Sequence, residues 1–264
     1  MNVSKPLLPG ARPLFLIGCP RSGTTFTANL LNSHPEVLMT SETAVFILAD
    51  DIIKKARGGV ASGINYGKQY HGLLSDMLAQ NYRSLIETYY ERIADEQQRQ
   101  YLSYWGEKHP HMHECIDRVE AEFPGARYVY IVRDPRDSTC SIADMIGVDY
   151  VSAINNWKVF ADAYEAFVAT LAPNRVLTLR YEDIVDDYYA AATTVFKWLE
   201  LPVAAQVLDF IHAAKDIDAH TTRTKKNFVT KSIGRWKDQL GSNDIDLTNA
   251  LVGDYLDKYG YGAA

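Results

Sequence analysis

Short apolar runs alternate with longer amphipathic stretches along most of this chain. The short runs are rich in apolar or β-branched residues and end at turn-forming or charged residues, which is typical of buried strands. The sequence predicts such strands over residues 14–17, 37–40, 101–105, 128–132 and 176–179. The longer stretches repeat their apolar positions with the period of an α-helix. They predict helices over residues 25–33, 43–55, 73–95, 111–123, 138–145, 151–171, 183–199 and 203–213.

This alternation of strand and helix predicts an α/β fold. Parallel strands joined by helical crossovers form a sheet whose two faces are both covered. We therefore expect a central parallel sheet of about five strands flanked by helices on both faces. In such sheets, ligands bind beyond the carboxyl ends of the strands. The chemistry of this chain is expected directly after residues 17, 40, 105, 132 and 179.

Length and composition narrow the class of protein. A chain of 264 residues with 47% hydrophobic residues fits one globular α/β domain over residues 1–264. The net charge of −6 argues against binding to nucleic acid or to an anionic membrane, so an anion site must be a local basic pocket. No apolar run reaches the roughly 20 residues that span a bilayer, and residues 1–12 are too poor in apolar residues for a signal peptide. Three cysteines without metal-type spacing favour a reduced, cytoplasmic protein.

Residues 18–25 (GCPRSGTT) join the first predicted strand to the first predicted helix. A strand, a tight turn and a helix start direct successive backbone N–H groups at one point, where the helix dipole adds partial positive charge. The spacing is similar to the phosphate loop G-x-x-x-x-G-K-[ST], but Thr24 replaces the lysine and Arg21 supplies the cation. We predict an anion site at this turn.

A second cationic segment follows the fourth predicted strand. Arg133 stands at the strand end, and Asp134 and Pro135 indicate a helix start by their N-cap and first-position preferences. Ser141 lies about two helical turns further on, where it can converge with Arg133 on one anion. Two cationic sites suggest a nucleotide with phosphates at both ends. A magnesium triphosphate site would instead need a P-loop lysine and a strand-end carboxylate.

Further polar groups follow the other strands. Glu42 follows the second strand, where it either caps the next helix or lies at the rim of the site. Residues 107–113 (EKHPHMH) follow the third, but their histidines lack partner cysteines and the His-x-x-x-His helix spacing, so we predict no metal there. Tyr181 follows the fifth, where it either stacks on a base or packs on the sheet edge. Residues 231–236 (KSIGRW) form a cationic segment with a glycine and an aromatic side chain, typical of a lid over a flat anion.

These motifs resemble those of the sulfotransferases that use 3′-phosphoadenosine 5′-phosphosulfate (PAPS). Residues 20–25 (PRSGTT) resemble the 5′-phosphosulfate loop of that family. Residues 132–141 are similar to its 3′-phosphate motif, including the eight-residue step from Arg133 to Ser141. The resemblance implies a P-loop-containing nucleotide-binding fold.

Two further segments extend this resemblance over most of the chain. Residues 233–236 (IGRW) resemble the C-terminal lid motif, and residues 179–183 (LRYED) resemble the segment whose tyrosine meets the adenine. The motifs occur in the order of the family, from Gly18 to Trp236. The resemblance implies that PAPS, and its product 3′-phosphoadenosine 5′-phosphate (PAP), are bound by Arg21, Ser22, Gly23, Thr24, Thr25, Arg133, Ser141, Tyr181, Lys231, Ser232, Arg235 and Trp236.

The resemblance also implies the groups that carry out the transfer. Residues 34–43 (HPEVLMTSET) resemble the protein-tyrosine sulfotransferase branch, in which a glutamate at the distance of Glu42 from the loop arginine accepts the proton of the acceptor. Lys108 matches a lysine that contacts the sulfuryl group or the leaving oxygen. The cytosolic small-molecule branch uses a histidine two residues after its lysine, where this chain has Pro110. His109 and His111 therefore stay second candidates for the base.

The implied activity is metal-free, in-line transfer of a sulfuryl group from PAPS to a hydroxyl, with Arg21 and Lys108 stabilising the oxygens. The alternatives are a P-loop kinase or NTPase, and a non-catalytic module that binds PAP. The predicted cytoplasmic location favours a small alcohol, phenol or carbohydrate as the acceptor, with the tyrosine-rich residues 57–102 shaping its side of the site. Dimerisation is common among enzymes of this kind, so a homodimer is compatible with the resemblance.

Overall fold

The computed structural model of the chain describes residues 10–58, 68–220 and 233–262. Five strands form one sheet in the order β2-β3-β1-β4-β5, and every neighbouring pair is parallel. The strands are β1 (Arg12–Gly18), β2 (Val37–Ser41), β3 (Tyr104–Lys108), β4 (Arg127–Val132) and β5 (Val176–Arg180). The predicted α/β fold with a five-stranded parallel sheet is confirmed.

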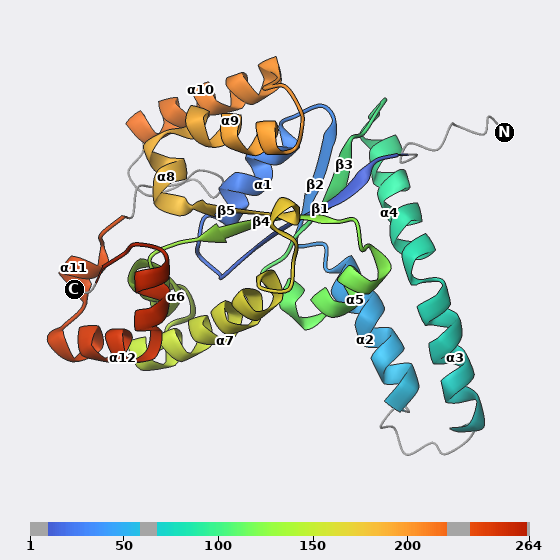
Figure 1. Cartoon of the computed structure of the whole chain (residues 1–264), viewed down its shortest axis with the longest axis horizontal. Helices are drawn as coiled ribbons and strands as arrows, with labels where there is room; N and C mark the ends of the chain where they lie inside the picture. Colours follow the sequence, from blue (N-terminus) through green and yellow to red (C-terminus); the bar gives the residue numbers. More distant parts are fainter. Residues whose placement is uncertain (1–9, 59–67, 221–232, 263–264) are drawn as a thin grey trace.

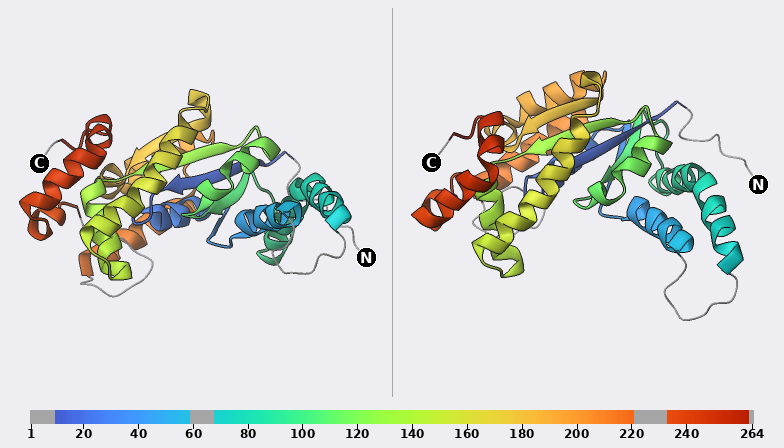
Figure 2. Two further views of the ribbon diagram at one scale, coloured as in Figure 1. Left: turned by 90° about the horizontal axis from the view of Figure 1, so that it is seen from below. Right: turned by 60° about the horizontal axis from the view of Figure 1, so that its bottom comes forward.

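Helices cover both faces of the sheet because successive side chains of each strand enter opposite cores. Leu14 and Leu16 of β1 lie in one apolar core, beneath α1 (Thr24–Asn32), α8 (Tyr181–Asp186), α9 (Tyr188–Trp198) and α10 (Ala205–His220) (Figure 1). Phe15 and Ile17 lie in the other, beneath α2 (Val45–Gly58), α4 (Tyr82–Glu96), α5 (Ile116–Glu122) and α7 (Tyr150–Val168). Figure 2 shows α3 (Lys68–Gln80) and α12 (Ser242–Lys258) at opposite ends of the molecule.

The third strand lies further along the chain than the sequence predicted. The expected range was 101–105, but β3 runs from Tyr104 to Lys108, and all five of its residues are buried. Gly106 lets β3 approach β1, since a Cβ at this position would lie 1.9 Å from the carbonyl oxygen of Leu14. The predicted range stops at residue 105 because a glycine and two charged residues follow, whereas Gly106, Glu107 and Lys108 are part of the strand.

Several helix boundaries also differ from the prediction. The single helix predicted over residues 73–95 is two helices, α3 and α4, with Asn81 between them. The predicted helix over 111–123 begins as a 3₁₀ turn, η1 (Met112–Glu114), and the one over 183–199 is divided into α8 and α9. Residues 135–146 form α6 (Pro135–Ile146), close to the prediction. The prediction missed α11 (Trp236–Gln239) and α12.

Among the residues that the structure describes, no helix combines the length and the apolar character needed to cross a bilayer.

Candidate active site

The turn between β1 and α1 has a backbone that fits the predicted anion site. Gly23 is the N-cap of α1 and has a positive φ of 85°. A Cβ there would lie 2.4 Å from the ring of Tyr181, so both conformation and space favour glycine. Thr24 and Thr25 then open the helix, where the first N–H groups have no acceptor within the helix. This turn directs backbone donors and the positive end of the α1 dipole to one side.

Arg21 connects the two cationic segments that the sequence singled out. Its Nε donates a hydrogen bond of 3.0 Å to Oγ of Ser141 on α6. Arg133, which directly follows β4, donates from Nη1 to the carbonyl oxygen of Arg21 over 2.6 Å. Because β1 and β4 are neighbours in the sheet, the two segments meet at its carboxyl edge. The structure therefore brings Arg21 into contact with both Ser141 and Arg133, whereas the sequence analysis expected two separate anion sites, one at Arg21 and one at Arg133 and Ser141.

Positive charge is concentrated at this edge. Burial and the neighbouring charges of Arg133 and Arg235 lower the pKa of Arg21. Among the described residues, Arg21 forms no ion pair with a carboxylate. Arg235, by contrast, forms an ion pair with Asp144. A bound anion would relieve the repulsion between these guanidinium groups, which makes the edge suited to phosphate or sulfate.

Tyr181 packs against both Arg133 and the anion turn. Its side chain is buried, the guanidinium of Arg133 lies 4.3 Å from its ring centroid, and its ring fills the space beside Gly23. These contacts support the anion turn. Contact between Tyr181 and an adenine stays a prediction.

Lys108 and Glu42 form an ion pair beside the turn. Lys108 ends β3, and its side chain is 2% exposed, whereas that of Glu42 is 55% exposed. The Lys108 ammonium donates to Oε1 of Glu42, and it lies 3.3 Å from Oγ1 of Thr25. Hydrogen bonding to Lys108 lowers the pKa of Glu42. The pair therefore combines a buried cation with a carboxylate that is ionised at neutral pH and open to solvent.

Glu107 is a residue whose function the sequence analysis missed. It is fully buried, and its Oε1 accepts hydrogen bonds from the backbone N–H of Thr43 (2.5 Å), the hydroxyl of Thr43 (2.8 Å) and the backbone N–H of Ala44 (3.0 Å). Glu42 and Ala44 both have positive φ angles, 59° and 60°. Such conformations cost about 1–3 kcal/mol each in non-glycine residues. The buried carboxylate therefore holds the strained turn that presents Glu42.

The reason for this arrangement lies in the sheet register. Thr40 pairs with Glu107, and Ser41 pairs with Lys108, so the turn after β2 lies beside the end of β3. The backbone N–H of Glu42 also donates to the carbonyl oxygen of Lys108 over 2.8 Å. The sequence shows only that a glutamate directly precedes the candidate lysine, and it does not reveal the partners of that glutamate.

The candidate histidines, His109 and His111, directly follow Lys108 along the chain. Burial and the nearby charge of His111 lower the pKa of His109, which favours its neutral form. Nδ1 of His109 accepts a hydrogen bond from the backbone N–H of His111 over 3.1 Å. The charges of both histidines contribute to the lowered pKa of Glu42, so they lie within electrostatic range of the carboxylate.

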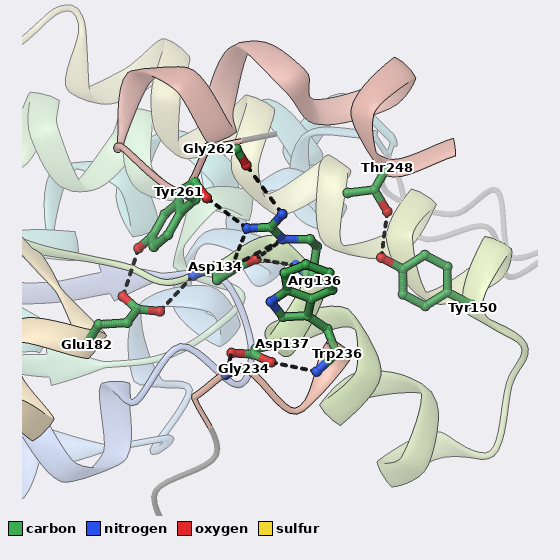
Figure 3. A network of polar contacts seen from close by, with 10 residues as sticks. All are labelled: Asp134, Arg136, Asp137, Tyr150, Glu182, Gly234, Trp236, Thr248, Tyr261 and Gly262. Carbon is green, nitrogen blue, oxygen red and sulfur yellow. Dashed lines mark hydrogen bonds and ion pairs between the residues drawn. The ribbon is translucent and has the colours of Figure 1, made fainter. Parts of the chain in front are cut away.

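The predicted lid segment is anchored to α6 where the structure describes it. Asp137 is fully buried and accepts hydrogen bonds from the backbone N–H groups of Gly234 (2.7 Å) and Trp236 (3.1 Å) (Figure 3). The guanidinium of Arg136 lies 4.0 Å from the ring centroid of Trp236 and is held by the carboxylate of Asp134. Trp236 thus packs against protein, and its contact with a nucleotide stays a prediction. Lys231 and Ser232 lie outside the described residues.

A family model and several known proteins match most of this chain. The family model described as the sulfotransferase family matches residues 13–205. The chain is 22% identical over 266 residues to protein-tyrosine sulfotransferase 1 of Danio rerio, covering 94% of this chain and 72% of that protein. It is 21% identical over 247 residues to an uncharacterized protein of Aquifex aeolicus (strain VF5), covering 87% of this chain. The chain spans only 31% of the length of that relative.

Solved structures show the same fold. The sulfotransferase domain of the curacin biosynthetic pathway has a TM-score of 0.61 at 18% identity, covering 91% of this chain and 97% of that one. A sulfotransferase from Mycobacterium avium has a TM-score of 0.57 at 15% identity, covering 95% and 77%. A mouse sulfotransferase complexed with PAP has a TM-score of 0.57 at 14% identity, covering 95% and 88%.

Proposed function

Since this chain belongs to the sulfotransferase family, we propose that it transfers the sulfuryl group of PAPS to a hydroxyl of a small-molecule or carbohydrate acceptor. The observation that carries this proposal is the position of the Lys108–Glu42 pair. A cation and an exposed carboxylate lie directly beside an anion turn that has its own arginine. A site that only bound the nucleotide would not need the Lys108–Glu42 pair.

The residues at the sheet edge fit the nucleotide. PAPS supplies an activated sulfuryl group on a phosphate leaving group. Arg21 and the N–H groups of residues 22–25 would hold its 5′ phosphate and sulfate, with one limit: the N–H of Ser22 already donates to the carbonyl oxygen of Cys19. Arg133 and Ser141 would hold the 3′ phosphate, together with Lys231, Ser232 and Arg235. The mutual repulsion of the guanidinium groups supports this assignment.

Glu42 is the group best suited to accept the proton. As the hydroxyl oxygen bonds to sulfur and the bond from sulfur to the phosphate oxygen breaks, Glu42 takes the hydroxyl proton. Lys108 and Arg21 neutralise the charge that develops on the sulfuryl and leaving oxygens. His109 is the second candidate, because its lowered pKa keeps it neutral and able to accept a proton.

Removal of divalent cations should leave the rate of sulfuryl transfer unchanged. The positive charge at the transferred group comes from Lys108, Arg21 and backbone N–H groups, so no magnesium ion is needed. The measurement is transfer from ³⁵S-labelled PAPS with and without EDTA, and with magnesium restored. A loss of activity in EDTA that magnesium restores would favour a P-loop kinase or NTPase.

The Glu107→Ala variant should lower kcat by about 10²-fold, because a catalytic group displaced by about 1 Å loses this much. Its affinity for PAP should stay close to that of the wild type. The Glu107→Gln variant should retain most of the activity, because its amide oxygen can accept the same hydrogen bonds from Thr43 and Ala44. Measured kcat and PAP affinity for both variants test this. Equal losses of kcat in the two variants would contradict the positioning role.

The acceptor needs its own experiment. The similarity to the protein-tyrosine sulfotransferase of Danio rerio concerns the chain as a whole at 22% identity, which does not identify an acceptor. A screen with ³⁵S-labelled PAPS against a metabolite extract, followed by mass spectrometry of the labelled product, would identify it. A protein that binds PAP but consumes PAPS with no acceptor in the panel would instead favour a binding module.

A further inference from the structure

The segment after β3 brings three potential metal ligands together. Residues 111–114 (HMHE) include the 3₁₀ turn η1, in which each turn takes three residues, so positions three apart share one side. His111 and Glu114 meet this condition, and Nδ1 of His111 lies 2.8 Å from Oε1 of Glu114. His113 completes the group: one ligand atom from each of the three residues lies within 4.8 Å of the other two.

This grouping explains why the sequence did not indicate a site. The sequence argument looked for His-x-x-x-His, which places two ligands on one face of an α-helix. Residues 111–114 are not in an α-helix, and the tighter turn brings ligands with shorter spacings together. The α-helical rule therefore does not apply to this segment.

The surroundings of the two imidazoles favour ligand binding over simple surface exposure. The rings of His111 and His113 lie edge-on to Phe160 of α7, with centroid distances of 5.1 Å and 4.7 Å. This contact limits how each ring can turn. Nδ1 of His113 is buried and makes no hydrogen bond of ordinary geometry among the described residues, although the backbone of Pro110 lies near the ring. A buried imidazole nitrogen without a partner is costly, and a metal ion is one group that would satisfy it.

We propose that His111, His113 and Glu114 bind one transition-metal ion of the zinc type. Two imidazoles and one carboxylate are a donor set that zinc accepts, with water at the fourth tetrahedral position. Hard cations such as magnesium prefer oxygen ligands and are disfavoured by the two nitrogens. The proposed sulfuryl transfer, with Glu42 as its base, requires none of these three residues.

The test is zinc binding by the full-length protein without an affinity tag, freed of metal by a chelator that is then removed. Isothermal titration against a competing chelator should give one zinc ion per chain. The His111→Ala and His113→Ala variants should each weaken binding by about tenfold or more, at least as much as the loss of an outer-shell partner. His212→Ala, which changes an exposed histidine on α10, is the matched control and should bind as the wild type does.

Cobalt gives a second, spectroscopic measurement. Co²⁺ in a four-coordinate site with nitrogen ligands should produce intense visible absorption in the wild type, which His111→Ala should abolish. His111 is exposed, so this variant is expected to fold even if His113→Ala does not. Zinc affinity that is equal in the wild type and His111→Ala, or absent in the wild type, would overturn the proposal. Because neither measurement uses turnover, failure of this site would not be confused with failure of the proposed function.

Discussion

The Glu42→Ala variant should lower kcat by about 10²–10⁴-fold, the usual contribution of a general base, with little change in PAP affinity. Two separate sets of contacts position Glu42 for this role. Its carboxylate is paired with the buried Lys108, and its backbone lies in the turn held by Glu107. Its side chain is more than half exposed, so an acceptor hydroxyl can reach it.

Steady-state kinetics at saturating PAPS, with PAP affinity from calorimetry, would test this expectation. Glu42→Gln is the closest structural match, since it keeps the shape of the side chain but cannot take the proton. Glu96→Gln, at an exposed glutamate in the last turn of α4, controls for the loss of one negative charge. Unchanged kcat in Glu42→Ala would move the role of the base to His109 or His111.

The pH profile provides an independent check on the same residue. Glu42 must be deprotonated to act, and the hydrogen bond from Lys108 lowers its pKa below the ordinary value of 4.5. Activity should therefore persist in mildly acidic solution and fall only as the pH decreases through that lowered pKa. Removal of the Lys108 ammonium raises the pKa of Glu42, so the acidic limb of Lys108→Ala should move to higher pH.

The Arg133→Ala variant should weaken PAP binding by at least about 30-fold, with a smaller effect on kcat at saturating PAPS. Truncation of a buried, hydrogen-bonded charge typically costs about 2 kcal/mol or more. Arg133 is 4% exposed, holds the carbonyl oxygen of Arg21 and lies over the ring of Tyr181. Its loss would remove both the proposed phosphate contact and a support of the anion turn.

Calorimetric titration with PAP measures this effect directly. Arg133→Lys keeps the positive charge but loses the planar guanidinium, which can contact a phosphate through two N–H groups. The PAP affinity of this variant should therefore lie between those of the wild type and Arg133→Ala. Arg12→Ala is a suitable control, because Arg12 begins β1 at the opposite end of the sheet. A defect confined to kcat, with PAP affinity unchanged, would contradict the placement of Arg133 at the 3′ phosphate.

Much of the site could be predicted because it lies in short, local patterns. A strand followed by a glycine-bearing turn predicts an anion cradle without knowledge of the rest of the fold, and residues 18–25 have this form. The rule that parallel strands place their carboxyl ends at one edge brings Arg133 to the same place. Both inferences depend on neighbours in the sequence or on a general property of parallel sheets.

The parts that were missed depend on contacts between distant residues. Glu107 is bonded to backbone groups more than 60 positions earlier, and a lone glutamate in a sequence gives no sign of such partners. The break at Asn81 was missed because the apolar period continues from α3 into α4. The anchoring of Trp236 by Asp137 joins residues 99 positions apart. Tertiary contacts of this kind leave no periodic pattern.

The order of the strands fixes the distance between the two sides of the candidate site, at the ends of β3 and β4. β1, which precedes the anion turn, lies between β3 and β4. Lys108 is the last residue of β3, and Arg133 directly follows β4. Neighbouring strands are spaced by about 4.8 Å, so the ends of β3 and β4 are held roughly 10 Å apart across the sheet. Insertions in the connecting loops would enlarge the rim without altering the distance between these two strand ends. Changes in the loops would therefore alter the rim, where we propose that the acceptor binds, while the residues proposed to bind the donor keep their spacing.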